Sequence, residues 1–283
     1  MTIAIDDRCT ACGACLITCP EGALVAAPRR PSVLARRCTD CLACVEVCPV
    51  DAIGPQTAGG SRHPIEVESY RIMSRRVDLS AWSGPEYEVV ARMVHATADP
   101  SFATSARIGE EAVARAVAAL RRGAPVVCDS KMVAAGIPSV TGAQCLLDEV
   151  PATAGQAPVG GEVAPGGAAP VGGIAGAGPP VPATRSAAAF RLAALRYPED
   201  ALWVVGNAPT ALAALVQLAA AGRVCPAAVI GLPVGYVGAA WWKERLWQSA
   251  LGPRSITNEG ERGGSPVAAA VVNALHRLAR DQV

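Results

Sequence analysis

Eight of the eleven cysteines occur in two copies of the pattern C-x2-C-x2-C-x3-C-P, and each member of the first copy recurs about 29 residues later. Thiolates at this spacing bind [4Fe–4S] clusters, and in chains with two such runs the fourth cysteine of each run binds the other run's cluster. The sequence therefore predicts two clusters. The expected ligands are Cys9, Cys12, Cys15 and Cys48 for the first cluster, and Cys38, Cys41, Cys44 and Cys19 for the second.

Zinc and disulfides explain this pattern less well. Structural zinc sites use paired C-x2-C units and not triplets followed by Cys-Pro. The first residues reach Asp6, Asp7 and Cys9 without an apolar run, so we expect no secretory signal and a reducing, cytoplasmic location. Residues 1–58 are therefore predicted to form a small α+β, ferredoxin-like domain. Its core is small, and the clusters should contribute much of its folding energy.

The whole chain has 283 residues, which allows a second, larger domain at 63–283. The net charge is +1 and no basic stripe is present, so no nucleic acid partner is expected. Ala201–Gly222 is uncharged, but glycine, asparagine, proline and glutamine interrupt it, which favours a strand, a turn and a helix over a membrane span. Residues 54–62 are typical of a linker. The stretch 151–183, rich in Gly, Pro and Ala, indicates a disordered insertion, with a mobile lid as the alternative.

Short apolar strands alternate with helices in the second domain. The predicted strands are Pro125–Cys128, Ala201–Val205 and Ala227–Ile230. The predicted helices are Ile65–Val77, Pro85–Ala98, Glu110–Arg122, Ala187–Arg196, Pro209–Ala221, Gly238–Ala250 and Ser265–Arg280. This alternation predicts an α/β fold with a three-layer, mostly parallel sheet.

Ligands of such sheets bind beyond the carboxyl ends of the strands. Three segments follow the predicted strands, beginning at Asp129, Gly206 and Gly231. The last two are glycine-bearing turns that open helices, so their backbone N–H groups could bind a carboxylate or phosphate. Tight turns alone are an equally good explanation of these glycines. Neither turn has a dinucleotide or P-loop pattern, and no nucleotide cofactor is expected.

Four further side chains could take part in chemistry. His95 lies three residues after Arg92 on a predicted helix, so the arginine should disfavour the charged imidazole. Ser69 lies on an apolar helix face, where its hydroxyl needs a partner. Arg185 precedes a helix start, where an anion is favoured. Taken singly, each of these residues also has an ordinary structural explanation.

Seven stretches of the second domain occur together in one family's order. They are HPIEVESYRIM from His63, RMVHATAD from Arg92, GAPVVCDSKMVAAGI from Gly123, TRSAAA from Thr184, GNAPTAL from Gly206, AVIGLPVGYVGAA from Ala228 and GGSPVAAAVVNAL from Gly263. From His63 to about Arg280 the chain resembles the precorrin-8X methylmutase family of cobalamin biosynthesis, also called cobalt-precorrin-8 methylmutase.

The resemblance implies a homodimeric isomerase that moves a methyl group from C-11 to C-12 of a corrinoid substrate, giving hydrogenobyrinate or cobyrinate. It implies that His95 is the general acid and base and that Ser69, Arg92 and Arg185 bind substrate. The matching strand-end stretches add a set of substrate-binding candidates. These are Asp129, Asn207, Gly231 and Gly235.

Two segments depart from the family pattern. Trp241 and Trp242 replace the usual Glu-Ser, and Glu259-Gly260-Glu261 replaces a basic Arg-Gly-Arg segment, which would weaken the binding of a polycarboxylate. An alternative is therefore an iron–sulfur electron-transfer protein whose second domain binds a corrinoid without isomerising it; another is a metabolite carrier. The clusters could serve a redox partner or a neighbouring pathway enzyme, or could be structural. The sequence leaves open whether the substrate contains cobalt.

Overall fold

The computed structural model describes residues 3–34, 36–39, 41–55, 64–138, 140, 142–152 and 184–281. The chain divides into two compact units, Met1–Val77 and Asp78–Val283. Most of the predicted linker and residues 153–183 of the predicted insertion lie outside the described residues, so the expectations for them stay predictions. The domain bounds 1–58 and 63–283 also stay predictions.

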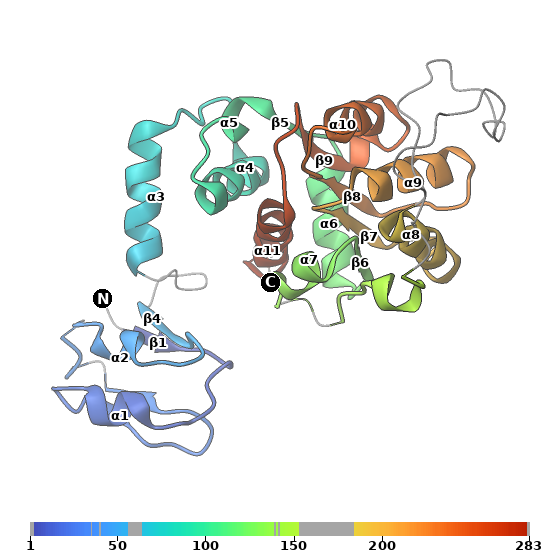
Figure 1. Ribbon diagram of the computed structural model, residues 1–283. Helices are drawn as coiled ribbons and strands as arrows, with labels where there is room; N and C mark the ends of the chain where they lie inside the picture. The colour runs from blue at the N-terminus through green and yellow to red at the C-terminus, as the bar shows by residue number, and fades with distance from the viewer. Residues whose placement is uncertain are drawn as a thin grey trace, which may run out of the picture. The chain divides into compact units, whose positions relative to one another are not determined.

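Two antiparallel strand pairs and two short helices form the cysteine-rich part of the first unit (Figure 1). Strand β1 (Ile3–Ile5) pairs with β4 (Ile53–Pro55), and β2 (Leu24–Val25) pairs with β3 (Ser32–Val33). Helices α1 (Ala14–Thr18) and α2 (Ala43–Glu46) each carry the third cysteine of a run. This part is α+β with short strands, as predicted.

The duplication in the sequence is visible in the backbone. Gly13 and Leu42 precede α1 and α2 at equivalent positions, and both have left-handed dihedrals, with φ of 79° and 62°. Glycine adopts this conformation freely, whereas leucine does so at a cost of about 1 kcal/mol or more. The repeated turn points the cysteines on either side of it toward a common centre.

Helix α3 (Pro64–Arg76) has 13 residues and close to the predicted bounds. Proline is suited to the first helical position because the N–H it lacks would have no partner there. The helix belongs to the first of the two compact units, together with the cysteine-rich segment.

A five-stranded sheet is the centre of the second unit, in the order β5 (Ala106–Ile108), β9 (Ser255–Asn258), β8 (Ala228–Gly231), β7 (Leu202–Val205) and β6 (Val126–Cys128). Strands β6 to β9 are parallel, and β5 pairs antiparallel with β9. The α/β, mostly parallel fold predicted from the sequence is therefore confirmed. Strands β7 and β8 are wholly buried, which explains their uninterrupted apolar residues.

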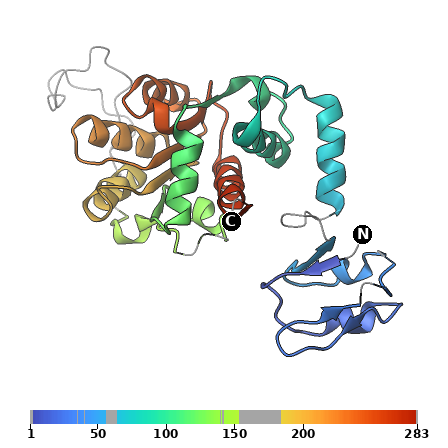
Figure 2. The ribbon, with the colours of Figure 1, turned by 180° about the vertical axis from the view of Figure 1, so that it is seen from behind.

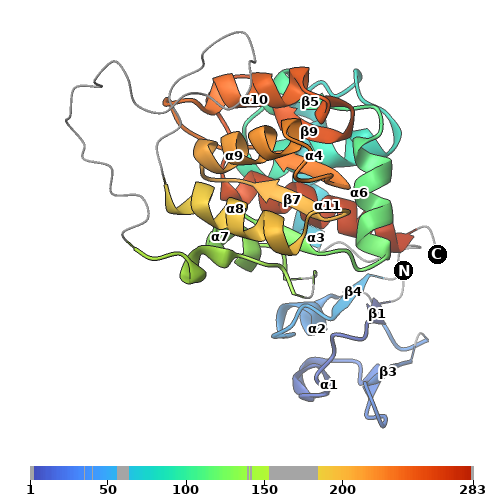
Figure 3. The ribbon, with the colours of Figure 1, turned by 90° about the vertical axis from the view of Figure 1, so that its right-hand side faces the viewer.

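Helices cover both faces of this sheet (Figures 2 and 3). On one face α11 (Ser265–Asp281) packs with α6 (Ala112–Arg121), and α4 (Gly84–Thr97) packs on α11. On the other face lie α8 (Arg185–Arg196), α9 (Pro209–Ala220) and α10 (Ala239–Gln248). The shorter helices are α5 (Phe102–Ser105), α7 (Lys131–Ala135), η1 (Leu146–Glu149) and η2 (Gly252–Arg254).

The segment Ala201–Gly222 forms β7 and α9, as the strand–turn–helix interpretation predicts. None of the helices in the described ranges combines the length and the apolar character that a membrane span requires. Trp203 of β7 is fully buried and packs edge-on against Phe190 of α8, with ring centroids 5.0 Å apart. This pair anchors the α8–α9 layer to the sheet.

Candidate cluster sites and active site

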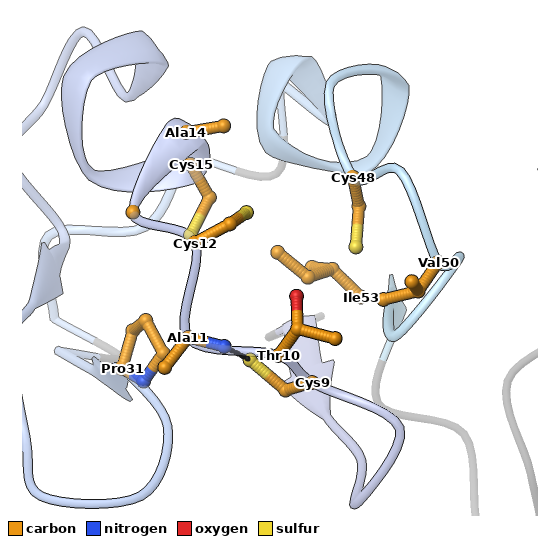
Figure 4. A pocket seen from close by; sticks show the side chains of 11 residues that line it. Cys9, Thr10, Ala11, Cys12, Ala14, Cys15, Pro31, Cys48, Val50 and Ile53 are labelled. Carbon is orange, nitrogen blue, oxygen red and sulfur yellow. Dashed lines mark hydrogen bonds between the residues drawn. The ribbon is translucent and has the colours of Figure 1, made fainter.

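Four thiols from both cysteine runs face one hollow in the first unit (Figure 4). They belong to Cys9, Cys12, Cys15 and Cys48. Burial raises the pKa of the Cys15 thiol, and the nearby sulfurs of Cys9, Cys12 and Cys48 raise it further. The quartet thus joins three thiols of the first run with the fourth of the second.

The other four thiols gather around Cys44 of α2. Burial raises the pKa of this thiol to about 11, and the nearby sulfurs of Cys19, Cys38 and Cys41 act in the same direction. Four thiol donors around one centre form the donor set of a [4Fe–4S] cluster, so both quartets fit that group. Among the described residues no three His, Cys, Asp or Glu side chains lie close enough to hold a single metal ion.

Backbone N–H groups point at the sulfurs at equivalent positions of the duplication. Ala23 N–H donates to Cys19 Sγ (3.3 Å), and Ala52 N–H donates to Cys48 Sγ (3.2 Å). Ala11 N–H also donates to Cys9 Sγ (3.4 Å). Hydrogen bonds to cluster sulfurs raise reduction potentials, so these contacts would tune both clusters in a similar way.

His95 and Arg92 lie near the end of α4. The helix buries Val89, Val90 and Met93, while His95 and Arg92 are half-buried. One turn after His95, the Asp99 carboxylate accepts a hydrogen bond from Arg262, in the loop between β9 and α11.

Further ion pairs join β5 to the same loop and to α10. Arg107 of β5 donates to Glu259 of that loop (Nε to Oε1, 2.9 Å) and to Glu244 of α10. The Asp99–Arg262 pair ties the residues after α4 to the loop that follows β9, whereas the pairs of Arg107 tie β5 to that loop and to α10. The chain four residues after His95 is thus tied to the loop after β9, at the edge of the sheet where ligands of this fold class bind.

Asp129 follows β6 and is fully buried. Its carboxylate accepts backbone N–H hydrogen bonds from Gly206 (3.0 Å), Asn207 (2.8 Å) and Ala208 (2.6 Å). Burial raises the pKa of this carboxyl, and the three N–H donors act against that shift. The expectation that these three N–H groups are available to a ligand is wrong, because Asp129 already binds them. Asn207 itself is exposed at the turn.

The loop between β8 and α10 lies beside the loop between β9 and α11. Gly235 N–H donates to Glu261 O (3.1 Å), and Gly264 N–H donates to Leu232 O (2.9 Å). Gly235 has a φ of 133°, a conformation that side chains rarely adopt. Gly231 has a packing role, since a Cβ there would lie 2.5 Å from Leu246 Cδ2.

Lys243 of α10 is a polar residue of this edge that the sequence reasoning missed. It is 1% exposed, and its Nζ donates to Asn258 Oδ1 (3.1 Å) and to Arg262 O (2.6 Å). Burial lowers the pKa of the ammonium to about 8. The signal was available, because Ala239, Trp242, Lys243 and Leu246 form one buried helical stripe.

Arg185 opens α8, after Thr184 caps the helix through Ala187 N–H (3.2 Å). Its Nη2 donates to Leu147 O (2.7 Å) and Val150 O (3.3 Å), and its buried Nε has no hydrogen-bond partner within the described part of the chain. Part of the guanidinium therefore holds the backbone at the end of η1.

Ser69 is half-buried on α3, in the first unit. Its assignment to one site with Arg92 and His95 stays a prediction.

The departures from the family pattern have local explanations. Trp242 is buried, and Trp241 packs edge-on against it with ring centroids 4.5 Å apart. Arg245 lies over the Trp241 ring at 5.1 Å. The Glu259 carboxylate is bound to Arg107, so its charge is offset within the protein. Glu261 is exposed beside the strand-end loops.

The fold and these sites define an α/β enzyme domain joined to an eight-cysteine domain for two iron–sulfur clusters. Comparison with known proteins gives the family. The model for precorrin-8X methylmutase matches residues 64–157 and 177–278, and the model for a 4Fe-4S dicluster domain matches residues 8–52.

Individual relatives agree with these matches. The cobalt-precorrin-8 methylmutase of Synechocystis sp. is 35% identical over 77% of this chain and 96% of its own. The precorrin-8X methylmutase of Sinorhizobium sp. is 35% identical over 74% and 91%. The solved structure of precorrin-8X methylmutase from Thermus thermophilus is 32% identical, covers 77% of this chain and 96% of its own, and has a TM-score of 0.61.

The chain belongs to the precorrin-8X methylmutase family. It is a methylmutase, an isomerase of cobalamin biosynthesis that acts on a corrinoid, and it carries a fused 4Fe-4S dicluster domain whose eight cysteines bind iron–sulfur clusters.

Proposed function

We propose that the second unit moves a methyl group from C-11 to C-12 of precorrin-8X or cobalt-precorrin-8, with His95 as the general acid and base. The observation that carries this proposal is the ion contact between Asp99 and Arg262, which ties the residues directly after α4 to the loop that follows β9. An imidazole four residues before this contact would reach a ligand bound beyond the strands.

The shift breaks one carbon–methyl bond and forms another, with no net change in redox state. A protonated His95 would donate a hydrogen bond or a proton to the macrocycle as the methyl group migrates, and would take the proton back afterwards. Arg92 and the free part of Arg185 would bind substrate carboxylates. Ser69 is the third residue that we predict to bind substrate.

The strand-end candidates divide by role. Asn207 and Gly235 lie on exposed or half-exposed loops and would contact substrate. Asp129 and Gly231 would act indirectly, by holding the loop after β7 and by allowing α10 to pack closely. No nucleotide cofactor enters this mechanism, and the homodimer implied by the resemblance remains part of the proposal.

The decisive experiment mixes the anaerobically purified protein with precorrin-8X and, separately, with its cobalt form, and follows the visible spectrum. We expect conversion of one substrate, and a rate about 100-fold or more lower in His95→Gln, because general acid–base catalysis contributes on that order. His276→Gln is the matched control, since His276 is a half-buried histidine of α11 outside the site. A His95→Gln variant that keeps the wild-type rate would exclude this role.

The alternative is an electron-transfer protein whose second unit binds a corrinoid without isomerising it. The exposed Glu261 beside the strand-end loops favours it, because a second acidic group there would repel substrate carboxylates. Spectral evidence of binding to both substrates without conversion of either would support this alternative. Bound clusters would transfer single electrons. A redox partner could use them whether the second unit is an isomerase or only binds a corrinoid.

We also propose the ligand assignment in which Cys9, Cys12, Cys15 and Cys48 hold one cluster and Cys38, Cys41, Cys44 and Cys19 hold the other. The common hollow of the first quartet and the neighbours of Cys44 support it. The test compares Cys48→Ser with Cys9→Ser and Cys19→Ser by iron content and EPR. The first two should lose the same cluster signal and Cys19→Ser the other; the same signal lost in Cys9→Ser and Cys19→Ser, with the other lost in Cys48→Ser, would refute it.

A further inference from the structure

The hairpin of β2 and β3 gathers most of the positive charge of the cysteine-rich segment. Residues 1–58 contain five arginines and six acidic residues, and four of the arginines flank this hairpin. They are Arg29 and Arg30, between the strands, and Arg36 and Arg37, three and four positions after β3. All four are exposed, and the ion pairs among the described residues involve none of them. The fifth, Arg8, is paired with Asp6.

The outward face of the same hairpin is apolar. Leu24 and Val33 are opposite each other and pack into the core, so their neighbours Val25 and Ser32 point outward. Leu34 follows on the same outward side. Val25 and Leu34 are 39% and 37% exposed. Along the hairpin they lie between its tip, which carries Arg29 and Arg30, and its open end, which Arg36 and Arg37 follow. The surface therefore has an apolar centre and a basic rim.

Each end of the hairpin adjoins one cluster site. Pro31 follows Arg30 and lines the hollow of the first quartet (Figure 4). At the other end Arg37 directly precedes Cys38 of the second quartet. The N–H groups of Arg37 and Cys38 both donate to Leu34 O, at 2.9 and 3.2 Å, which fixes this turn. A protein bound to the hairpin would lie close to both clusters.

We propose that the β2–β3 hairpin is the docking surface for an acidic electron-transfer protein that exchanges single electrons with the clusters. An apolar centre with a charged rim is typical of protein interfaces, and unpaired surface charges of one sign raise association rates with partners of the opposite sign. In the transfer the reduced partner loses one electron and one cluster gains it, with no bond made or broken. This proposal rests on the proposed function, because it requires that the cysteine-rich segment holds its two clusters.

The test uses the full chain with its clusters in place, under anaerobic conditions. A reduced plant-type [2Fe–2S] ferredoxin with an acidic surface is the probe, and stopped-flow absorbance gives the second-order rate of cluster reduction. Binding of the oxidised probe, followed by NMR, gives a second measurement that does not depend on reduction potentials. The variants are Arg29→Gln/Arg30→Gln, Arg36→Gln/Arg37→Gln and all four changes together.

We expect the fourfold variant to react about 10-fold more slowly than the wild type at about 10 mM ionic strength, where the Debye length is about 30 Å. The difference should shrink to about twofold or less at about 1 M, where the Debye length is about 3 Å. Each pair should give part of the effect. Arg75→Gln/Arg76→Gln is the matched control, because it removes two exposed arginines of α3 in the same unit and should leave the rate unchanged.

Reduction by photoreduced deazaflavin, a small uncharged donor, shows whether the clusters are intact and reducible. Equal deazaflavin rates in the wild type and the fourfold variant, with slow ferredoxin reduction of the variant only, would support the docking surface. Unchanged ferredoxin rates and binding, or an equal loss in the α3 control, would overturn it while leaving the electron-carrier function in place. Clusters that deazaflavin cannot reduce in the wild type would overturn the electron-carrier function itself.

Discussion

Asp129 contributes to the site by binding backbone. Its buried carboxylate joins the end of β6 to the turn that follows β7 through three N–H groups. In Asp129→Ala these groups would lose their acceptor inside the protein. Each unsatisfied buried group costs about 1–3 kcal/mol, and partial entry of water reduces the sum.

We therefore expect Asp129→Ala to lower the free energy of unfolding by about 3 kcal/mol, as measured by urea denaturation of the cluster-loaded protein. Asp129→Asn keeps one acceptor oxygen and the shape of the side chain, so its loss should be smaller. An alanine variant as stable as the wild type would show that the carboxylate does not hold this turn.

Lys243 should make stability depend on pH in the alkaline range. Its pKa is about 8 when folded and 10.5 in the unfolded chain, so the unfolded state binds more protons between these values. The free energy of unfolding then rises with pH across this window. Burial of the ammonium costs up to about 3 kcal/mol below about pH 8, and this cost is relieved as the pH rises toward about 10.5.

The measurement is the difference in unfolding free energy between the wild type and Lys243→Met, from pH 7 to pH 10. Effects of the clusters and of other groups cancel in this difference. Above pH 8, we expect the unfolding free energy of the wild type to rise relative to that of Lys243→Met by up to about 1.4 kcal/mol per pH unit. A flat difference would show that Lys243 stays charged in the folded state.

The residues of the site could be predicted only in part. The cysteine ligands follow from spacing alone, and His95, Arg92 and Arg185 follow from the family resemblance. Lys243 follows from neither: its place on the apolar stripe of α10 was a signal, but a lysine in a helix is normally exposed, and its burial depends on the partners that β9 and its loop supply. The structural role of Asp129 depends on the pairing of β6 with β7, which local sequence does not contain.

At the scale of elements, the arrangement of α4 depends on contacts between distant loops. Asp99 and Arg262 are separated by 163 positions in the sequence, and their side chains are 21% and 64% exposed. An exposed ion pair contributes about 1 kcal/mol or less to stability. Its larger effect should be on where the end of α4, and with it His95, lies relative to the substrate.

We expect Asp99→Asn to raise KM or lower kcat by several-fold while the unfolding free energy changes by less than about 1 kcal/mol. Steady-state kinetics and urea denaturation give the two values. Asp200→Asn is the matched control, since Asp200 pairs with Arg122 on an exposed surface and should leave both unchanged. Wild-type kinetics in Asp99→Asn would mean that this contact does not position α4.

Three of the four parallel strands were predictable, because β6, β7 and β8 are continuous apolar segments between helices. Strands β5 and β9 were missed for physical reasons. Strand β5 has only three residues, and β9 buries the polar residues Ser255, Thr257 and Asn258, whose side chains find hydrogen-bond partners in tertiary contacts. A run such as Ser-Ile-Thr-Asn gives no sign of burial before those partners are known.

At the scale of the whole molecule, each unit has its own source of stability. The core of the first unit includes Cys15 and Cys44 beside a few apolar residues, whereas the second unit has a large apolar core on both faces of its sheet. Loss of the clusters should therefore affect the first unit far more than the second.

We expect removal of iron by oxidation and chelation to unfold the cysteine-rich segment and to leave the methyl shift within about twofold of its original rate. Circular dichroism, proteolysis and the conversion assay measure these effects. The bleached visible spectrum of the clusters confirms that iron has been removed. Loss of conversion together with iron would show that the clusters support the isomerase, which the two separate cores do not predict.

The quartet of Cys9, Cys12, Cys15 and Cys48 takes thiols from both copies of the duplication, and this constrains how the first unit could have originated. Neither half of the duplication contains the four thiols of a cluster site in that arrangement, because Cys48 of the second run faces Cys9, Cys12 and Cys15 of the first. A single ancestral repeat could have completed its sites only by pairing with another copy of itself. A synthetic peptide of one repeat, supplied with iron and sulfide, should accordingly assemble as a dimer with two clusters and not as a monomer with one.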